Sequence, residues 1–308
     1  MKAARTILIF GGMLAFVTVP AVGHTYTFTA DDGVWGDEDN WYSETGESYP
    51  QYADTAIIPS GKICRVENDD QHAEIIQVSG TLGIVGKKLA LGKNDGATTS
   101  TVNGTVYFKE VGGVRGCLAV RDWVTIGGSG TLTASKGTDS TYAGRILTYG
   151  EEQGDPPVWV VYGLGLILDD TVVLKGTVQL WCRIEIKTEA AVVVDDPDDV
   201  FNVADVPLWN GAWVVLDGDG RFQVDAGALV FKSVQFAETT PWWNLTGGEL
   251  ELFDIPNCNI RFLNIPVEIV MTGGTFDIND PLSTTGGLEF SGGQIEVAPN
   301  KTAQFFYE

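Results

Sequence analysis

Four aspartates around a proline form the densest group of potential metal ligands in the chain. Asp195, Asp196, Asp198 and Asp199 flank Pro197. Carboxylate oxygens are the ligands that calcium prefers, and a hard cation would relieve the repulsion between neighbouring negative charges. The alternative is a hydrated acidic loop without a cation, which is the usual form of such charge runs. The cation-free loop is favoured, so no cofactor is predicted, and calcium is the one kept open.

Tryptophans supply the second kind of candidate site. Trp242 and Trp243 are adjacent, and adjacent residues of a strand lie on opposite faces, so one of the two is expected on the outside. Trp209 and Trp213 flank Asn210-Gly211 in a similar way. Flat aromatic faces stack on sugar rings, whereas packing beneath a loop is the alternative. These four tryptophans are the predicted sugar-binding residues.

Few other groups suit catalysis. Cleavage of the chain after Gly23 would make His24 the amino terminus, and with His72 it would offer the nitrogen ligands that suit copper. Cleavage after Ala21 would abolish that set. Asp169-Asp170 presents paired carboxylates at a strand entry, where a solvated turn is the alternative. No catalytic residue is predicted.

Composition narrows the class of protein. The 308 residues include 41 Asp and Glu against 19 Lys and Arg, a formal net charge of −22. Such a chain lacks the basic surface that nucleic-acid binding needs. The hydrophobic fraction of 44% and the charged fraction of 19% exclude a disordered chain.

The first residues predict export. Residues 1–23 combine a basic start at Lys2 and Arg5, an apolar stretch from Ile7 to Val19, and a small-residue end. This is the pattern of a secretory signal peptide, cleaved after Ala21 or after Gly23. No later apolar run approaches the ~20 residues of a membrane span. The mature protein is therefore expected to be secreted or at the cell surface, without a transmembrane segment.

Four cysteines enter an oxidising compartment in this interpretation. Cys64, Cys117, Cys182 and Cys258 allow two disulfides in three connectivities. Their spacings match no zinc or redox motif. The alternative, favoured here, is that they are small buried apolar residues.

A glycine phrase recurs along the chain and predicts the fold. A glycine precedes alternating apolar and polar residues, which is the period of a strand with one buried face. We interpret the glycine as a positive-φ corner before each strand. The first steps are 24 and 26 residues, and a following step of 46 is interpreted as two repeats with a blurred middle copy. The phrase begins at Gly80, Gly104, Gly130, Gly176, Gly227, Gly247, Gly273, Gly286 and Gly292.

One such turn cannot bury its own apolar face, whereas a stack of turns buries a continuous column. The period suits a right-handed parallel β-helix (solenoid) with three short strands in each of roughly nine coils. We expect an N-terminal cap region over residues 24–66 and coils with inserted loops over 67–308. Lys136–Pro157 and Asp195–Asp205 are the expected loops. An antiparallel sandwich or jelly roll is the alternative.

The N-terminal part of the chain resembles a known group. The pattern that carries the resemblance consists of Trp35, Asn40-Trp41, Pro50, the stretch 54–61 and the stretch 73–84. It is similar to the opening phrase of bacterial secreted β-solenoid surface proteins. The I-P-x-G and G-x-L stretches are also similar to the eight-glycine extracellular domain. The resemblance implies a solenoid fold and no shared catalytic residue. We expect Trp35 and Trp41 to plug the open end of the apolar column.

The sequence therefore favours an exported, non-enzymatic structural or adhesive element of a cell surface or extracellular matrix. Its expected partners are other surface proteins or an extracellular polysaccharide. The alternative is a carbohydrate-active protein on a β-helix, either a lyase or hydrolase of polysaccharides or a sugar-binding module.

Overall fold

The computed structural model describes residues 23–45, 48–134, 144–153, 158–161 and 163–203, and beyond Val203 it describes Ala226 and the strands named below. Within these residues the regular structure is strand, apart from a single 3-10 turn, η1 (Glu38–Asn40). The predicted all-β class is confirmed, and the sheets are parallel. The proposed signal peptide lies outside the described residues, except for Gly23.

Three large sheets and one hairpin contain all the described strands. Sheet A has the spatial order β3 (Trp41–Ser43), β1 (Thr25–Phe28), β4 (Thr55–Ile58), β7 (Ile75–Val78), β10 (Thr98–Val102), β13 (Asp122–Gly127), β18 (Gly163–Leu168), β21 (Arg183–Ile186), β24 (Ala212–Leu216), β27 (Val234–Ala237), β30 (Ile260–Phe262) and β33 (Leu288–Phe290). Sheet B has the order β2 (Asp32–Val34), β5 (Ile63–Val66), β8 (Thr81–Val85), β11 (Thr105–Lys109), β14 (Thr131–Ala134), β19 (Val173–Gly176), β22 (Ala191–Val194), β25 (Arg221–Val224), β28 (Trp242–Leu245), β31 (Val267–Met271) and β34 (Gly293–Val297). Sheet C has the order β6 (Gln71–Ala73), β9 (Lys88–Leu91), β12 (Gly116–Val120), β15 (Gly144–Thr148), β20 (Val178–Trp181), β23 (Val200–Val203), β26 (Ala228–Lys232), β29 (Glu249–Phe253), β32 (Thr275–Asn279) and β35 (Ala303–Phe306). The hairpin pairs β16 (Gly150–Gln153) with β17 (Val158–Val161).

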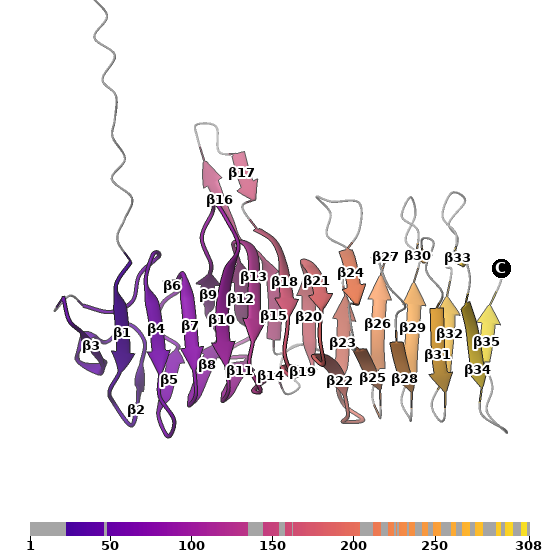
Figure 1. The fold of residues 1–308 in the computed structure, drawn as a ribbon, viewed down its shortest axis with the longest axis horizontal. Coiled ribbons are helices and arrows are strands. Elements are labelled where there is room, and N and C mark those ends of the chain that lie inside the picture. The colour runs from indigo at the N-terminus through magenta and orange to yellow at the C-terminus, as the bar shows by residue number, and fades with distance from the viewer. Residues whose placement is uncertain are drawn as a thin grey trace, which may run out of the picture.

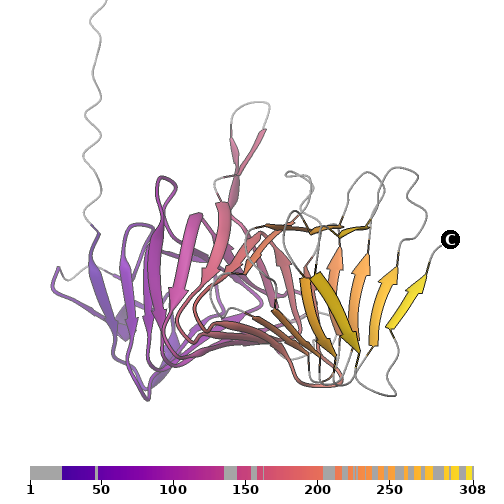
Figure 2. The ribbon, with the colours of Figure 1, turned by 45° about the vertical axis from the view of Figure 1, so that its right-hand side comes forward.

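The chain visits the three sheets in rotation. β7, β8 and β9 lie in sheets A, B and C, and β10 then returns to sheet A in parallel beside β7. Among the described strands, the antiparallel pairs are β1 with β3 and β16 with β17. Figure 1 shows the strands succeeding one another along the long axis from the indigo to the yellow end. Figure 2 shows from a second direction that the sheets lie on different sides of the stack. Each strand therefore pairs with strands of the preceding and following turns.

Alternation of residue types explains both the strands and the core. In β11, Val106 and Phe108 are buried, while Tyr107 between them is partly exposed. Val106 is in register with Leu82 on β8 and Leu132 on β14, and both of those side chains are also buried. Equivalent apolar residues therefore stack turn upon turn, and each buried side chain of this size stabilises the fold by ~1.5–3 kcal/mol.

The predicted positive φ before each strand is confirmed at Gly176, which has a φ of 88°. It is wrong at Gly80, Gly104 and Gly130, which have no positive φ. Instead, a Cβ on Gly104 would clash with the carbonyl oxygen of Gly80, and a Cβ on Gly130 would clash with that of Gly104. The same carbonyls accept hydrogen bonds from Thr105 and Thr131 at 2.9 and 3.0 Å. The corners are tightly stacked backbones, and glycine is needed because there is no room for a side chain.

The 46-residue interval between Gly130 and Gly176 also differs from the prediction. The prediction of two repeats between Gly130 and Gly176 is wrong, because β14 pairs directly with β19 and Thr131 is in register with Val173. One turn spans this interval and contains an insertion. The phrase at Gly176 leads into β20 of sheet C, whereas those at Gly104 and Gly130 lead into sheet B. The glycine phrase therefore marks strand entries in more than one sheet.

Both predicted loops are shorter than expected. Lys136–Pro157 was expected as one loop, yet it contains β15, an inner strand of sheet C, and β16, one arm of the hairpin. In Figure 1 this hairpin projects beyond the stack. In the second segment, Asp195–Asp205, the turn ends where β23 begins at Val200. Short strands with few apolar residues are hard to distinguish from polar loops in a sequence. This explains why strands were missed in both predicted loops.

Two tryptophans lie at the first turn. The Trp35 side chain is 0% exposed and the Trp41 side chain is 8% exposed. Their rings meet edge to face with centroids 5.0 Å apart, and Trp41 makes the same kind of contact with Phe28 at 5.1 Å. Trp41 Nε1 donates a 2.6 Å hydrogen bond to the carbonyl of Trp35. Edge-to-face pairs of this kind add about 0.5–1.5 kcal/mol to the effect of burial.

The three described cysteines are free. Cys64 and Cys182 are buried and Cys117 is partly buried, whereas Cys258 lies outside the described residues. The two-disulfide alternative therefore has no support from Cys64, Cys117 and Cys182, which act as apolar residues of the strands and corners. Among the described residues, no helix has the length and apolar character needed to cross a membrane.

Candidate functional site

The four aspartates of the predicted calcium site make separate contacts. Asp195 forms an ion pair with Lys175 at 3.3 Å. Asp196 closes the turn, since its Oδ1 accepts a hydrogen bond from the amide of Asp198 at 2.9 Å and its carbonyl accepts one from Asp199 at 2.9 Å. Asp199 turns inward and accepts a 2.9 Å hydrogen bond from Thr177 Oγ1.

Electrostatics single out Asp199 within this turn. Burial raises the pKa of its carboxyl, and the neighbouring Asp196 and Asp195 raise it further, while the hydroxyl of Thr177 acts in the opposite direction. Among the residues that the structure describes, no group of three or more His, Cys, Asp or Glu side chains gathers as a metal site. The carboxylates of this turn hold the backbone at the entry to β23. Calcium binding stays a prediction.

The predicted sugar-binding tryptophans fall in the later turns. Trp209 lies outside the described residues. Trp213 is in β24, and Trp242 and Trp243 begin β28, where Trp243 is in register with the buried Phe222 and Trp242 with Arg221. Trp242 and Trp243 therefore occupy consecutive positions of one strand. Sugar binding by the predicted tryptophans stays a prediction.

His72 lies in a cluster that sequence reasoning missed. Its Nδ1 is 3.1 Å from Nη2 of Arg121, and its ring meets that of Tyr149 edge to face at 6.1 Å. The guanidinium of Arg121 lies 3.8 Å from the centroid of the Tyr149 ring and 4.2 Å from that of Tyr52. Arg121 is thus held between two aromatic rings, and its side chain is 4% exposed.

This cluster joins distant parts of the chain. Arg121 Nη1 donates to Oδ1 of Asn94 at 3.3 Å, and the amide of Asn94 donates to the hydroxyl of Tyr52 at 2.9 Å. Arg121 and Tyr149 each follow a strand of sheet C, and backbone hydrogen bonds connect these corners to the preceding turns. Each cation–π contact contributes ~0.5–2 kcal/mol. We interpret the cluster as a clamp across four successive turns.

The other histidine has a role at the chain's start. The His24 backbone amide donates a 2.8 Å hydrogen bond to Oδ1 of Asp54, and its carbonyl accepts from Thr55 at 2.8 Å. His72 meanwhile faces Arg121 and Tyr149. Both histidines therefore have structural contacts on separate elements.

Asp169 and Asp170 form a corner between sheets A and B. Asp169 Oδ1 accepts hydrogen bonds from Thr188 Oγ1 at 2.6 Å and from the amide of Asp170 at 2.8 Å. These bonds, that of Thr188 foremost, lower the pKa of the Asp169 carboxyl. Asp170 has a φ of 57° and accepts a 2.8 Å hydrogen bond from the amide of Gly128. Asp169 and Asp170 therefore form a turn, which was the predicted alternative to a pair of catalytic carboxylates.

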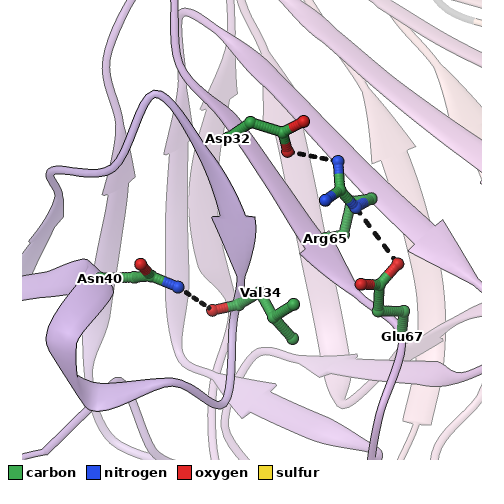
Figure 3. A network of polar contacts seen from close by, with 5 residues as sticks. All are labelled: Asp32, Val34, Asn40, Arg65 and Glu67. Carbon is green, nitrogen blue, oxygen red and sulfur yellow. Dashed lines mark hydrogen bonds and ion pairs between the residues drawn. The ribbon is translucent and has the colours of Figure 1, made fainter.

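An ion network lies on the outer face of sheet B near the first turn. Figure 3 shows Arg65 of β5 between two carboxylates, those of Asp32 on β2 and Glu67. In the same view, Nδ2 of Asn40 donates a 3.0 Å hydrogen bond to the carbonyl of Val34. Ion pairs this exposed contribute ~0–1 kcal/mol, so their main effect is to define how β2 meets β5.

Comparison with protein-family models, curated proteins and solved structures finds no match.

Proposed function

We propose that the chain is exported and forms a right-handed parallel β-helix with an N-terminal cap, acting as a non-enzymatic structural or adhesive element of a surface or extracellular matrix. The observation that carries this proposal is the rotation of the chain through three large sheets with parallel pairing from β4 to β35, interrupted by the β16–β17 hairpin. Such a stack offers a long, regular outer surface whose length is set by the number of turns.

The polar groups at the corners support the same role. The Asp169–Asp170 carboxylates accept hydrogen bonds from neighbouring turns, and Asp199 bonds to Thr177. These acidic groups hold the backbone of the stack in place, as expected of a scaffold. The burial of Trp35 and Trp41 at the first turn supports the proposed cap, because a coil stack without one would expose its apolar interior.

A fractionation experiment tests the proposal. Producing cells would be separated into cytoplasm, membrane, surface wash and medium, and the amino terminus of the chain would be sequenced in each. We expect the chain in the surface wash or medium, starting at Val22 or His24. An unprocessed chain confined to the cytoplasm would contradict the proposal.

A second assay addresses the non-enzymatic part. The purified chain would be incubated with acidic and neutral polysaccharides, and new reducing ends and unsaturated products would be measured. We expect no product above the protein-free blank. Turnover that disappears in Asp169→Asn but survives in the control Asp195→Asn would instead assign an active site to the A–B corner.

A further inference from the structure

The outer face of sheet C carries a row of side chains on neighbouring strands in which Cys117 lies between cationic and polar residues. The register pairs Lys88 on β9 with Cys117 on β12, Cys117 with Arg145 on β15, and Arg145 with Gln179 on β20. The residue that follows each of them in its strand is buried in the core. Since neighbouring strands are ~4.8 Å apart, the row runs along the direction in which the turns stack.

Two arginines converge on one neutral acceptor in this row. Arg115 Nη1 and Arg145 Nη2 donate hydrogen bonds of 3.1 and 3.2 Å to the same atom, Oε1 of Gln179. The guanidinium of Arg145 also lies 4.3 Å from the centroid of the Trp181 ring. We call this surface the guanidinium face; it consists of Arg115, Cys117, Arg145, Gln179 and Trp181.

The environment of Arg145 differs from that of the paired cations on sheet B. On sheet B, Lys175 pairs with Asp195, and Arg65 pairs with Asp32 and Glu67. No carboxylate of the described residues lies within ion-pair distance of Arg145, although the chain has 41 acidic residues and 19 basic ones. Guanidinium groups are strong bidentate donors to carboxylates and other oxyanions, and here the Arg145 group is bonded to an amide instead.

The charges on this face act on each other. Burial lowers the pKa of Arg145, and the positive charge of Arg115 lowers it further. Burial raises the pKa of Cys117, while Arg145 and Arg115 oppose that rise. An anion hydrogen-bonded to Arg145 would counter the effect of burial and of Arg115 on that guanidinium, which makes the Arg145 group complementary to negative charge.

We propose that the guanidinium face binds an acidic polysaccharide, with a carboxylate or sulfate of the sugar chain accepting hydrogen bonds from Arg145. The partly buried ring of Trp181 lies beside Arg145 and offers an apolar contact for a sugar ring. The straight row along the stack suits an extended polymer. This inference names the partner of the adhesive role proposed above and rests on it.

The test is affinity electrophoresis of the purified mature chain through gels containing polygalacturonate, a sulfated dextran or neutral dextran. With its net negative charge the chain should be repelled by a polyanion, so retardation requires a specific site. We expect retardation by at least one acidic polymer and none by neutral dextran. The carboxylated and sulfated arms show which oxyanion is recognised.

Matched variants locate the site. Arg145→Gln should weaken binding about tenfold, the loss expected when one charge-assisted hydrogen bond is removed. Arg145→Lys keeps the positive charge but lacks the planar guanidinium group. Its affinity should lie between those of Arg145→Gln and wild type. Lys175→Gln removes the same charge from sheet B and should bind like wild type. Thermal unfolding of each variant shows whether the fold is retained, and the comparison of Arg145→Lys with wild type carries the test should Arg145→Gln fail to fold.

The outcomes separate this inference from the proposed function. Absence of retardation in every acidic gel, or equal losses in Arg145→Gln and Lys175→Gln, would overturn the inference while the fractionation result stands. An Arg145-dependent dimer in sedimentation velocity, without polymer binding, would assign the face to a second copy and also overturn it. Cytoplasmic retention would contradict the proposed function, whereas the gel result with purified chain would be unchanged.

Discussion

A Cβ atom on Gly104 would clash with the carbonyl oxygen of Gly80 in the preceding turn. The two glycines stack at the same corner, and their backbones approach closely because neither carries a side chain. This contact, repeated at Gly130, sets how near successive turns come to each other at the entry to sheet B.

Gly104→Ala should therefore destabilise the fold. The backbone of the neighbouring turn has to move, and overpacking of this kind costs ~1–3 kcal/mol in the free energy of unfolding. Chemical denaturation followed by circular dichroism measures the change. Gly36→Ala is the control, because its Cβ would meet only the end of the Gln71 side chain, at 3.2 Å. Equal losses in the two variants would contradict the stacking argument.

Thr188→Val should reduce stability at neutral pH by about 1 kcal/mol, since the lost hydrogen bond leads to an exposed carboxylate. The Thr188 hydroxyl lowers the pKa of Asp169 in the folded protein. Its contribution is therefore present above the unfolded pKa of 3.8 and is lost as the pH falls through the folded value. Val keeps the β-branched shape at the φ of 54°.

Urea unfolding of wild type and Thr188→Val across the acidic range checks this. The gap between the two proteins should close as the pH falls. Thr171→Val is the control, because Thr171 Oγ1 donates to the carbonyl of Gly128 and its loss should be independent of pH. A gap that widens in acid would contradict the assignment.

Asp199→Asn should show the opposite dependence on pH. Burial raises the pKa of Asp199 in the fold, so its protonated form is favoured there and stability is lost as the pH rises from 3.8 through the folded value. Asn has the same shape and still accepts from Thr177. The variant should gain stability relative to wild type at neutral pH and lose that gain in acid. Asp195→Asn, at an exposed position of the same turn, should show no such gain.

Trp41→Phe should destabilise the first turn by about 2 kcal/mol, because it removes the hydrogen bond to the Trp35 carbonyl and part of the buried ring. Hydrogen exchange should rise in β1 and β3 first. Tyr42→Phe changes the adjacent residue, whose side chain is 61% exposed, and should leave exchange unchanged. Protection that stays intact in Trp41→Phe would show that the tryptophan pair does not hold this end.

Thiol reactivity should rank the cysteines by burial. Burial raises the pKa of Cys182 to about 12 and raises that of Cys64 as well, so both should react only on unfolding. In a Cys258→Ser background, Cys117 should be modified first by a thiol reagent in the native state. Rapid native-state modification of Cys64 or Cys182 would contradict the described packing.

Much of the architecture could be predicted from the sequence, because the alternation of apolar and polar residues and the spacing of the glycine phrase are local signals. Between Gly80 and Gly293, sheet B contains nine described strands, from β8 to β34, in agreement with the predicted number of turns. The insertion after β14 could not be measured from spacing alone, since Thr131 and Val173 are neighbours across 42 residues. The inner strand Gly144–Thr148 contains the apolar Ile146 and Leu147, but it lies within a largely polar stretch that by itself predicts a loop.

The side-chain clusters on sheet C were beyond sequence reasoning. Tyr52, His72, Asn94, Arg121 and Tyr149 meet only after successive turns have been aligned. Arg115 and Gln179 are 64 residues apart, and no motif connects them. The acidic turn at Asp195–Asp199, by contrast, is a local feature that the sequence revealed, although its contacts are not the convergent set that the pattern suggested.

The excursion between β15 and β18 shows how such a chain can acquire new parts. Its hairpin, β16 and β17, leaves sheet C and returns to sheet A, while β14 and β19 pair on the opposite side as directly as their neighbours do. Foreign sequence placed between Gln153 and Val158 should therefore be displayed at one fixed height along the stack. The hairpin is a natural attachment point for an epitope or a guest domain.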